Sequence, residues 1–226
     1  MPAKANALKI TRHFTESGKD PFDKLSWSKK DVEIRNFDGT VAFSMKDVTL
    51  PDNYSQVASN VLAQKYLRKA GIPKKLRKVK EKAVPSWLQR SVPDLKAMED
   101  LPENEKFGEE VDGKQTFRRL AGTWTYWGWK HGYFASEADA KSYFDEMCYM
   151  LAFQMVSPNS PQWFNTGLNW AYGIEGPAQG HYFVNPKTGE LERSVNAYEH
   201  PQPCLLYTSD AADDMQCVDL GGRRII

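Results

Sequence analysis

The sequence has few cysteines, no long apolar run and almost no net charge. Its three cysteines, Cys148, Cys204 and Cys217, have no metal-like spacing, and so sparse and odd a set is typical of a reducing cytoplasm, not of a disulfide scaffold. No apolar run approaches the length that spans a bilayer, and residues 1–6 lead into no hydrophobic block of a secretory signal. The net charge of +1 gives no reason to expect binding to nucleic acid or to a membrane surface. We therefore expect a cytoplasmic protein.

The composition is that of a folded protein of one or two domains. Apolar residues make up 41% of the 226 residues, which is enough to bury a core. Residues 32–35 and 41–45 alternate around a turn signal at Asp38 and Gly39, which predicts a β-hairpin. We expect residues 1–30 to form an extended arm over something larger.

Two helices and a second hairpin are predicted further along the chain. Ser55 can cap a helix that runs to about Ala70, and Ser136 can cap a helix over residues 138–156. Cys148 lies beside the apolar stripe of the second helix, so we expect a buried, inert thiol. Residues 181–184 and 190–193 flank a turn, which predicts the second hairpin.

Charge is distributed unevenly. Lys65–Lys82 carries nine Lys or Arg residues and one acid, Glu81, whereas residues 94–112 carry eight acids against two lysines. The favoured interpretation of the basic run is a solvated helix face; the alternative is a patch for an anionic partner such as nucleic acid. The two stretches can partly neutralise each other, which weakens the alternative.

Aromatic residues concentrate in residues 117–134, where glycines interrupt them. Such a cluster is most often a packing nucleus where segments cross. The alternative is a base-stacking surface that includes Trp124–Trp129 and Lys130.

A proline-containing segment, residues 157–168, follows the second predicted helix. Pro158 and Pro161 each fix φ and remove a backbone donor, so the segment is predicted to be a stiff loop. A stiff loop that offers hydroxyl and amide groups suits an anion such as phosphate. The hydroxyl groups in question belong to Ser157, Ser160 and Thr166.

From residue types alone, a structural role for this loop is favoured. It would connect a helix to a strand, and Trp163 and Phe164 would fill the core.

Four stretches nevertheless carry a specific family resemblance. They are Ala63–Tyr66 with Lys69–Gly71, Leu120–Trp129, Pro158–Gly167 and Tyr198–Pro203. In this order and spacing, over most of residues 10–203, the sequence resembles the N-terminal part of adenosylcobalamin-dependent (class II, vitamin B12-dependent) ribonucleotide reductases.

The resemblance implies a fold and an activity. It implies an α+β N-terminal domain over residues 31–135, followed over residues 136–203 by the incomplete start of a ten-stranded α/β barrel. The family reduces ribonucleotides, in this branch ribonucleoside diphosphates, to 2′-deoxyribonucleotides for DNA synthesis. Adenosylcobalamin initiates thiyl radical chemistry there, nucleotide effectors are common, and a thioredoxin-type reductant supplies electrons.

The resemblance also implies one substrate-binding residue. Ser160 matches the family position whose hydroxyl binds the substrate phosphate, and Asn159 and Ser157 are weaker candidates. The radical cysteine, its partners and the cobalamin contacts lie downstream of this sequence, so we expect no catalytic or metal-binding residue here and no activity of the chain alone.

The tail over residues 204–226 departs from the family pattern. The redox cysteine of the family would fall at position 206, where this sequence has Leu206, and Cys204 comes two residues early. The tail resembles a translated transposon-type sequencing adapter, which implies a gene truncated at a contig edge; a genuine divergent C-terminus is the alternative.

Three functions are left in competition. The first is an incomplete class II reductase. The second is a non-enzymatic module that binds nucleic acid or nucleotides through Lys65–Lys82 and Trp124–Trp129. The third is a structural or allosteric accessory domain, although no effector motif is present.

Overall fold

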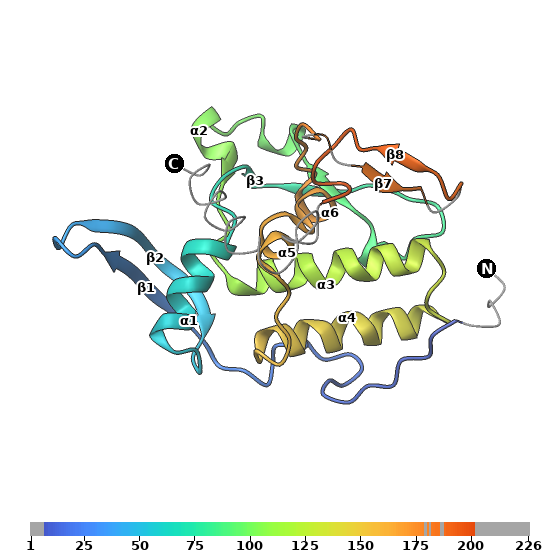
Figure 1. Cartoon of the computed structure of the whole chain (residues 1–226), viewed down its shortest axis with the longest axis horizontal. Helices are drawn as coiled ribbons and strands as arrows, with labels where there is room; N and C mark the ends of the chain where they lie inside the picture. The colour runs from blue at the N-terminus through green and yellow to red at the C-terminus, as the bar shows by residue number, and fades with distance from the viewer. Residues whose placement is uncertain (1–6, 179, 181, 186–187, 202–226) are drawn as a thin grey trace, which may run out of the picture.

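Two long helices lie side by side at the centre of the molecule (Figure 1). The computed structural model describes residues 7–178, 180, 182–185 and 188–201. Helix α3 (Gly113–Lys130) begins at a capping box formed by Asp112 and Gln115. Helix α4 (Glu137–Ala152) begins at Ser136, whose hydroxyl accepts from the Asp139 amide at 3.2 Å, as predicted. It ends four residues earlier than the apolar pattern suggested.

The N-terminal hairpin is confirmed. Strands β1 (Trp27–Arg35) and β2 (Val41–Pro51) pair antiparallel, and their far end extends away from the body of the molecule (Figure 1). At the near end Val32, Val48 and Leu50 are almost fully buried and share one core with α3 and α4. The hairpin is thus anchored at its base by apolar burial.

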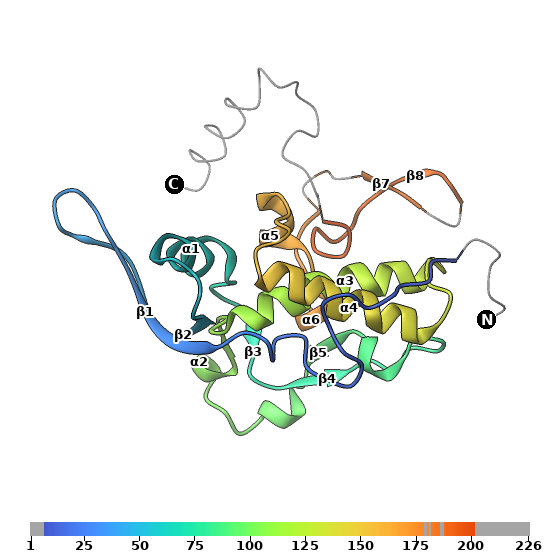
Figure 2. The same ribbon diagram turned by 90° about the horizontal axis from the view of Figure 1, so that it is seen from below.

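The polar segment before β1 lies extended along α4 (Figure 2). Its backbone amides at Phe14 and Thr15 donate to the Glu146 carboxylate, and Arg12 forms an ion pair with Asp145 at 2.8 Å. Because both acids are buried on α4, the arm supplies the donors that their carboxylates require.

The helix predicted after Ser55 is shorter than expected. Ser55 caps α1 (Gln56–Val61), which continues as the π-helical turn η1 (Leu62–Tyr66) and stops before Leu67, not at Ala70. The next residue explains the stop, because the Arg68 amide donates to the Glu110 carboxylate at 2.8 Å and its carbonyl accepts from the Glu110 amide. Those bonds require an extended backbone in place of another helical turn.

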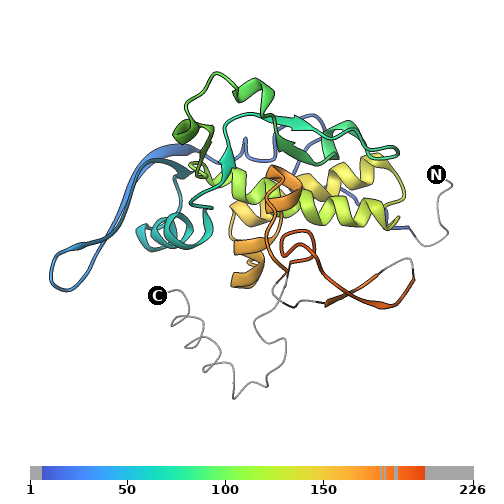
Figure 3. The same cartoon turned by 90° about the horizontal axis from the view of Figure 1, so that it is seen from above.

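The prediction of a helical face for the basic run was wrong. Residues from Leu67 to Lys82 form loops and two short strands, β3 (Ile72–Pro73) and β4 (Leu76–Lys78), because Gly71 and Pro73 interrupt a helix and the strands find partners. Strand β3 pairs with β6 (Phe107–Gly108) of the acidic run, so the two oppositely charged stretches do lie together (Figure 3). Strand β4 pairs with β5 (Ser91–Pro93). The other elements of this region are η2 (Ser86–Leu88), η3 (Lys96–Met98) and α2 (Glu103–Lys106).

The proline-containing segment is not a simple loop. It forms two short helices, α5 (Ser160–Asn165) and α6 (Leu168–Tyr172), separated by a left-handed Gly167. Proline is favourable in the first turn of a helix, so Pro161 starts α5 where we expected it to prevent a helix. The second hairpin is confirmed as β7 (Tyr182–Val184) with β8 (Leu191–Arg193). Within the described ranges, all named strands form two-stranded antiparallel sheets.

The aromatic stretch is a packing nucleus, which was the favoured interpretation. Most of it also lies in helix α3, which was not predicted because of its glycines. Gly122 and Gly128 on α3 leave no room for a Cβ, since it would overlap the rings of Trp170 and Phe134. Trp124 packs against the main core, and the other tryptophans of α3 pack around Tyr126. The aromatic rings therefore serve to join segments, and the interpretation as a base-stacking surface loses its support.

Gly167 gives a test of this close packing. Its φ is +87°, and a Cβ there would overlap the carbonyl oxygen of Arg119, whereas Gly39 has a φ of +85° and open space around it. Gly39→Ala should cost about 1–2 kcal/mol from the left-handed conformation alone. Gly167→Ala should cost about 3 kcal/mol or more, because backbone overlap is added. Urea unfolding of both variants measures the difference, and equal losses would contradict the packing argument.

Candidate functional site

Ser160 lies at the exposed start of α5 and faces Tyr66. The Ser160 side chain is half-buried, and its Oγ lies 3.5 Å from the Tyr66 hydroxyl oxygen. Asn159, at the N-cap position, is exposed and its side chain makes no capping bond. The two residues are thus both reachable from solvent at one end of a short helix.

Trp163 fixes α5 to the body of the protein. Its ring is 5% exposed, stacks on the Tyr66 ring at 5.0 Å and 17°, and meets the Phe117 ring edge-on at 6.1 Å. Trp163 therefore fills the core as predicted. Phe164 does not, because 38% of its surface is exposed, although its ring also lies 5.7 Å from the Tyr66 ring.

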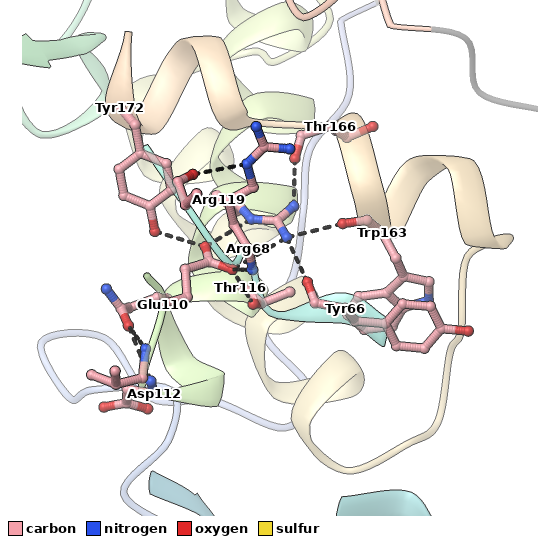
Figure 4. A network of polar contacts seen from close by, with 12 residues as sticks. Tyr66, Arg68, Glu110, Asp112, Thr116, Arg119, Trp163, Thr166 and Tyr172 are labelled. Carbon is pink, nitrogen blue, oxygen red and sulfur yellow. Dashed lines mark hydrogen bonds and ion pairs between the residues drawn. The ribbon is translucent and has the colours of Figure 1, made fainter. Parts of the chain in front are cut away.

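A buried arginine holds the other end of α5. The Arg119 guanidinium, 1% exposed on α3, donates to the carbonyls of Trp163 at 2.9 Å and Thr166 at 2.8 Å (Figure 4). The same group donates to the Tyr66 carbonyl at 3.0 Å. One side chain thus satisfies the last carbonyls of α5 and of η1, and fixes the two helical turns that carry Ser160 and Tyr66 relative to each other.

The charge of Arg119 is compensated by Glu110, which is fully buried. The Arg119 Nε donates to Glu110 Oε1 at 2.9 Å. The same carboxylate accepts from the Thr116 hydroxyl at 2.8 Å, the Tyr172 hydroxyl at 2.7 Å and the Arg68 amide at 2.8 Å (Figure 4). Both charged groups thus have several hydrogen-bond partners within the protein.

These contacts determine the ionisation of the pair. Burial by itself would raise the pKa of Glu110, but the Arg119 guanidinium and the hydrogen bonds hold that pKa below its ordinary value. Burial, and then the Glu110 charge, raise the pKa of the Tyr172 phenol well above its ordinary value. The network is therefore an ionised pair with a neutral phenol at neutral pH.

The three hydroxyls predicted to bind an anion, those of Ser157, Ser160 and Thr166, do not point to a common site. Thr166 is 1% exposed, so its side chain is not offered to a ligand, contrary to the expectation for a loop. Ser157 is exposed and lines a hollow of about 410 Å³ with Trp124, Tyr143 and other residues, whereas Ser160 is not among the lining residues. Of the three, Ser160 alone has a second hydroxyl beside it.

No pattern in the sequence indicates the network behind this site. Arg119 follows another arginine, and Glu110 stands in an acidic run, so both have the appearance of surface charges. Their burial together is decided by contacts between distant segments. Tyr66 did belong to a stretch with family resemblance, but only the structure places its hydroxyl beside Ser160.

Comparison with known proteins gives the family. The family described as "Class II vitamin B12-dependent ribonucleotide reductase" matches residues 28–154, which is more than half of the chain. The chain belongs to this family. The match spans β1 to the end of α4 and assigns the mixed α/β region to the N-terminal domain of class II reductases.

Individual reductases of this family are similar over almost the whole chain. Proteins named vitamin B12-dependent ribonucleotide reductase from Bradyrhizobium diazoefficiens and Agrobacterium fabrum are each 54% identical over 215 residues, which is 95% of this chain. One of the same name from Streptomyces avermitilis is 32% identical over 166 residues, or 73% of the chain. The chain spans 17% of the length of the first two relatives and 14% of the third.

The described residues contain no group of three or more His, Cys, Asp or Glu side chains that could hold a metal ion. The hollow beside α4 is lined by uncharged side chains. Cys148 is buried as expected, and burial raises the pKa of its thiol. Cys204, Cys217 and Leu206 lie outside the described residues, as does the whole stretch 204–226. None of the helices in the described ranges has the length and apolarity to cross a membrane.

Removing the buried arginine should destabilise this chain strongly. Arg119→Met leaves the Glu110 charge buried and uncompensated, so we expect a loss of about 3–5 kcal/mol in the free energy of unfolding. Arg118→Met is the matched control, because Arg118 is the next residue of α3 and pairs with Asp20 at the surface; its loss should be below about 1 kcal/mol. Urea unfolding followed by circular dichroism measures both, and similar losses would refute the role assigned to Arg119.

The same pair predicts a pH dependence. The Glu110 pKa is lowered by folding, so its contribution to stability is complete above the unfolded pKa of about 4.3 and is lost as the pH falls towards the folded pKa. The stability difference between wild type and Glu110→Gln should therefore shrink below about pH 4.3, by up to about 1.4 kcal/mol per pH unit. Urea unfolding at pH 7, 5, 4 and 3 gives this difference, and a constant value would contradict the assignment.

Proposed function

We propose that this chain forms the N-terminal part of an enzyme that reduces ribonucleoside diphosphates to 2′-deoxyribonucleotides. The observation that carries the proposal is the 54% identity, over 95% of the chain, to two proteins named vitamin B12-dependent ribonucleotide reductase. The enzyme acts in the cytoplasm, uses adenosylcobalamin and a thioredoxin-type reductant, and responds to nucleotide effectors. The cofactor supplies the radical that leads to a cysteine thiyl, and the residues for that chemistry belong to other parts of the enzyme.

The proposed division of the chain places the site at a domain junction. Residues 1–30 are an arm, residues 31–135 the N-terminal domain, residues 136–203 the start of the ten-stranded barrel, and residues 204–226 a non-native tail. This division is supported by exposed apolar side chains, which further strands of the barrel would cover. Those of the C-terminal segment are Met155, Phe164, Tyr182, Val184, Leu191 and Val195, with 38–86% of their surface exposed.

Within this enzyme, Ser160 binds the substrate phosphate. Its hydroxyl is half-buried, stands at the solvent-facing start of α5, and is held by Trp163 and Arg119. A hydroxyl that donates to an anionic oxygen makes a charge-assisted bond, stronger than a bond between neutral groups. Asn159 and Ser157 are weaker candidates, since both are exposed and Ser157 lines a separate hollow.

A hybrid reductase tests the proposal. In it, residues 1–201 of this chain replace the matching N-terminal segment of the Bradyrhizobium diazoefficiens relative. The hybrid should reduce CDP only when adenosylcobalamin is added, and the 226-residue chain alone should be inactive. A folded hybrid without activity, or activity of the chain alone, would overturn the proposed function.

The role of Ser160 is tested in the same hybrid. Ser160→Ala should raise the KM for CDP about tenfold or more, because a hydrogen bond to a charged group contributes about 1.5–3 kcal/mol. Ser44→Ala, an exposed serine on β2, is the control and should leave KM unchanged. Steady-state assays over a range of CDP concentrations give both values. An unchanged KM in Ser160→Ala would remove Ser160 from the substrate site.

A further inference from the structure

Two hydroxyl groups from distant segments face each other beside the proposed phosphate position. Tyr66 ends η1 and Ser160 begins α5, 94 residues later, yet their hydroxyl oxygens lie 3.5 Å apart. No other hydrogen-bond partner of the Tyr66 hydroxyl is found in the described part of the chain. The pair is therefore placed by the fold and is not a local feature of either segment.

The distance between the two hydroxyls suits a third oxygen better than it suits a direct bond. Hydroxyl pairs that bond well have oxygens about 2.7–2.8 Å apart, so 3.5 Å is a weak contact. An acceptor oxygen can lie at about 2.7 Å from both atoms at once, because the two donors are less than twice that distance apart. The arrangement is that of two donors converging on one acceptor.

The Tyr66 side chain is held in this position before any ligand arrives. Its ring stacks on Trp163 at 5.0 Å and lies 5.7 Å from the Phe164 ring, and its carbonyl accepts from Arg119. A phenol with only two side-chain torsions, fixed by stacking, loses little conformational entropy on binding. The Tyr66 hydroxyl can then bind a ligand with little loss of conformational entropy.

We propose that Tyr66 is a second substrate ligand, and that Tyr66 and Ser160 donate together to one oxygen of the substrate diphosphate. The inference rests on the proposed function of Ser160 and extends it to a residue outside the proline-containing segment. Both groups are uncharged, so they add direction to the binding of the anion without adding charge. The acceptor fits because a phosphate oxygen takes several hydrogen bonds, whereas two neutral hydroxyls can make only one bond with each other.

The test is Tyr66→Phe in the hybrid reductase. The ring and its stack on Trp163 are kept and only the hydroxyl is lost, so the thermal unfolding midpoint should stay that of wild type. The KM for CDP should rise about tenfold with kcat within about twofold. Tyr133→Phe, at a tyrosine with 58% of its surface exposed, is the control and should change neither value.

Two further readouts separate substrate contact from a structural effect. Because both hydroxyls serve one oxygen, the double variant Tyr66→Phe/Ser160→Ala should raise KM by less than the product of the single effects. Inhibition by cytidine, which has no phosphate, should be the same in wild type and Tyr66→Phe. Equal weakening of cytidine and CDP would show a distorted site and overturn the inference.

The outcomes also separate this inference from the proposed function. A raised KM in Ser160→Ala with an unchanged KM in Tyr66→Phe would overturn the role of Tyr66 alone. A folded but inactive wild-type hybrid would overturn the proposed function. An NMR titration of the wild-type and Tyr66→Phe 226-residue chains with CDP then decides the inference: weaker binding in the variant supports it, and equal binding or no binding refutes it.

Discussion

The buried ion pair between Arg119 and Glu110 is the interaction on which this structure depends. A buried pair contributes little net stability compared with apolar side chains, because desolvation offsets most of the attraction. Its effect here is geometric: the guanidinium reaches three main-chain carbonyls and the carboxylate reaches two hydroxyls and an amide. The main-chain carbonyls of Tyr66, Trp163 and Thr166 are thereby paired, although their segments end or turn at a buried point. An apolar pair of the same size could not do this.

Local signals in the sequence predicted the elements whose causes are local. The turn at Gly39, the caps at Ser55 and Ser136 and the second hairpin depend on neighbouring residues, and the structure has each of them. No helix was predicted for the aromatic stretch, because Gly122 and Gly128 disfavour a helix locally, by about 1 kcal/mol each. That cost is offset by contacts with Trp170 and Phe134, which no local pattern reveals.

The candidate site was predictable only in part, for the same reason. Ser160 was identified from a family pattern, and the stiffness of its segment from two prolines. The contacts that hold Ser160 in place could not be predicted, because burial of Arg119 depends on Glu110 and on the carbonyls of two other segments. A charged residue in a sequence gives no sign that a partner from nine residues away will be buried with it. The hydroxyl of Tyr66 likewise acquires meaning only beside Ser160.

The contacts that fix the site in place determine which of its side chains can be substituted. Arg119 binds the segments of Tyr66 and Ser160 through main-chain carbonyls. The side chains at the solvent-facing end are therefore not needed to hold these segments together, apart from the Tyr66 ring, which stacks on Trp163. The Glu110 pKa is held low, so the supporting pair stays ionised throughout the neutral range. Glu110 therefore neither gains nor loses a proton in that range. The fold thus separates the groups that set the geometry of the proposed phosphate position from the groups that would contact the phosphate, and a change in one set need not disturb the other.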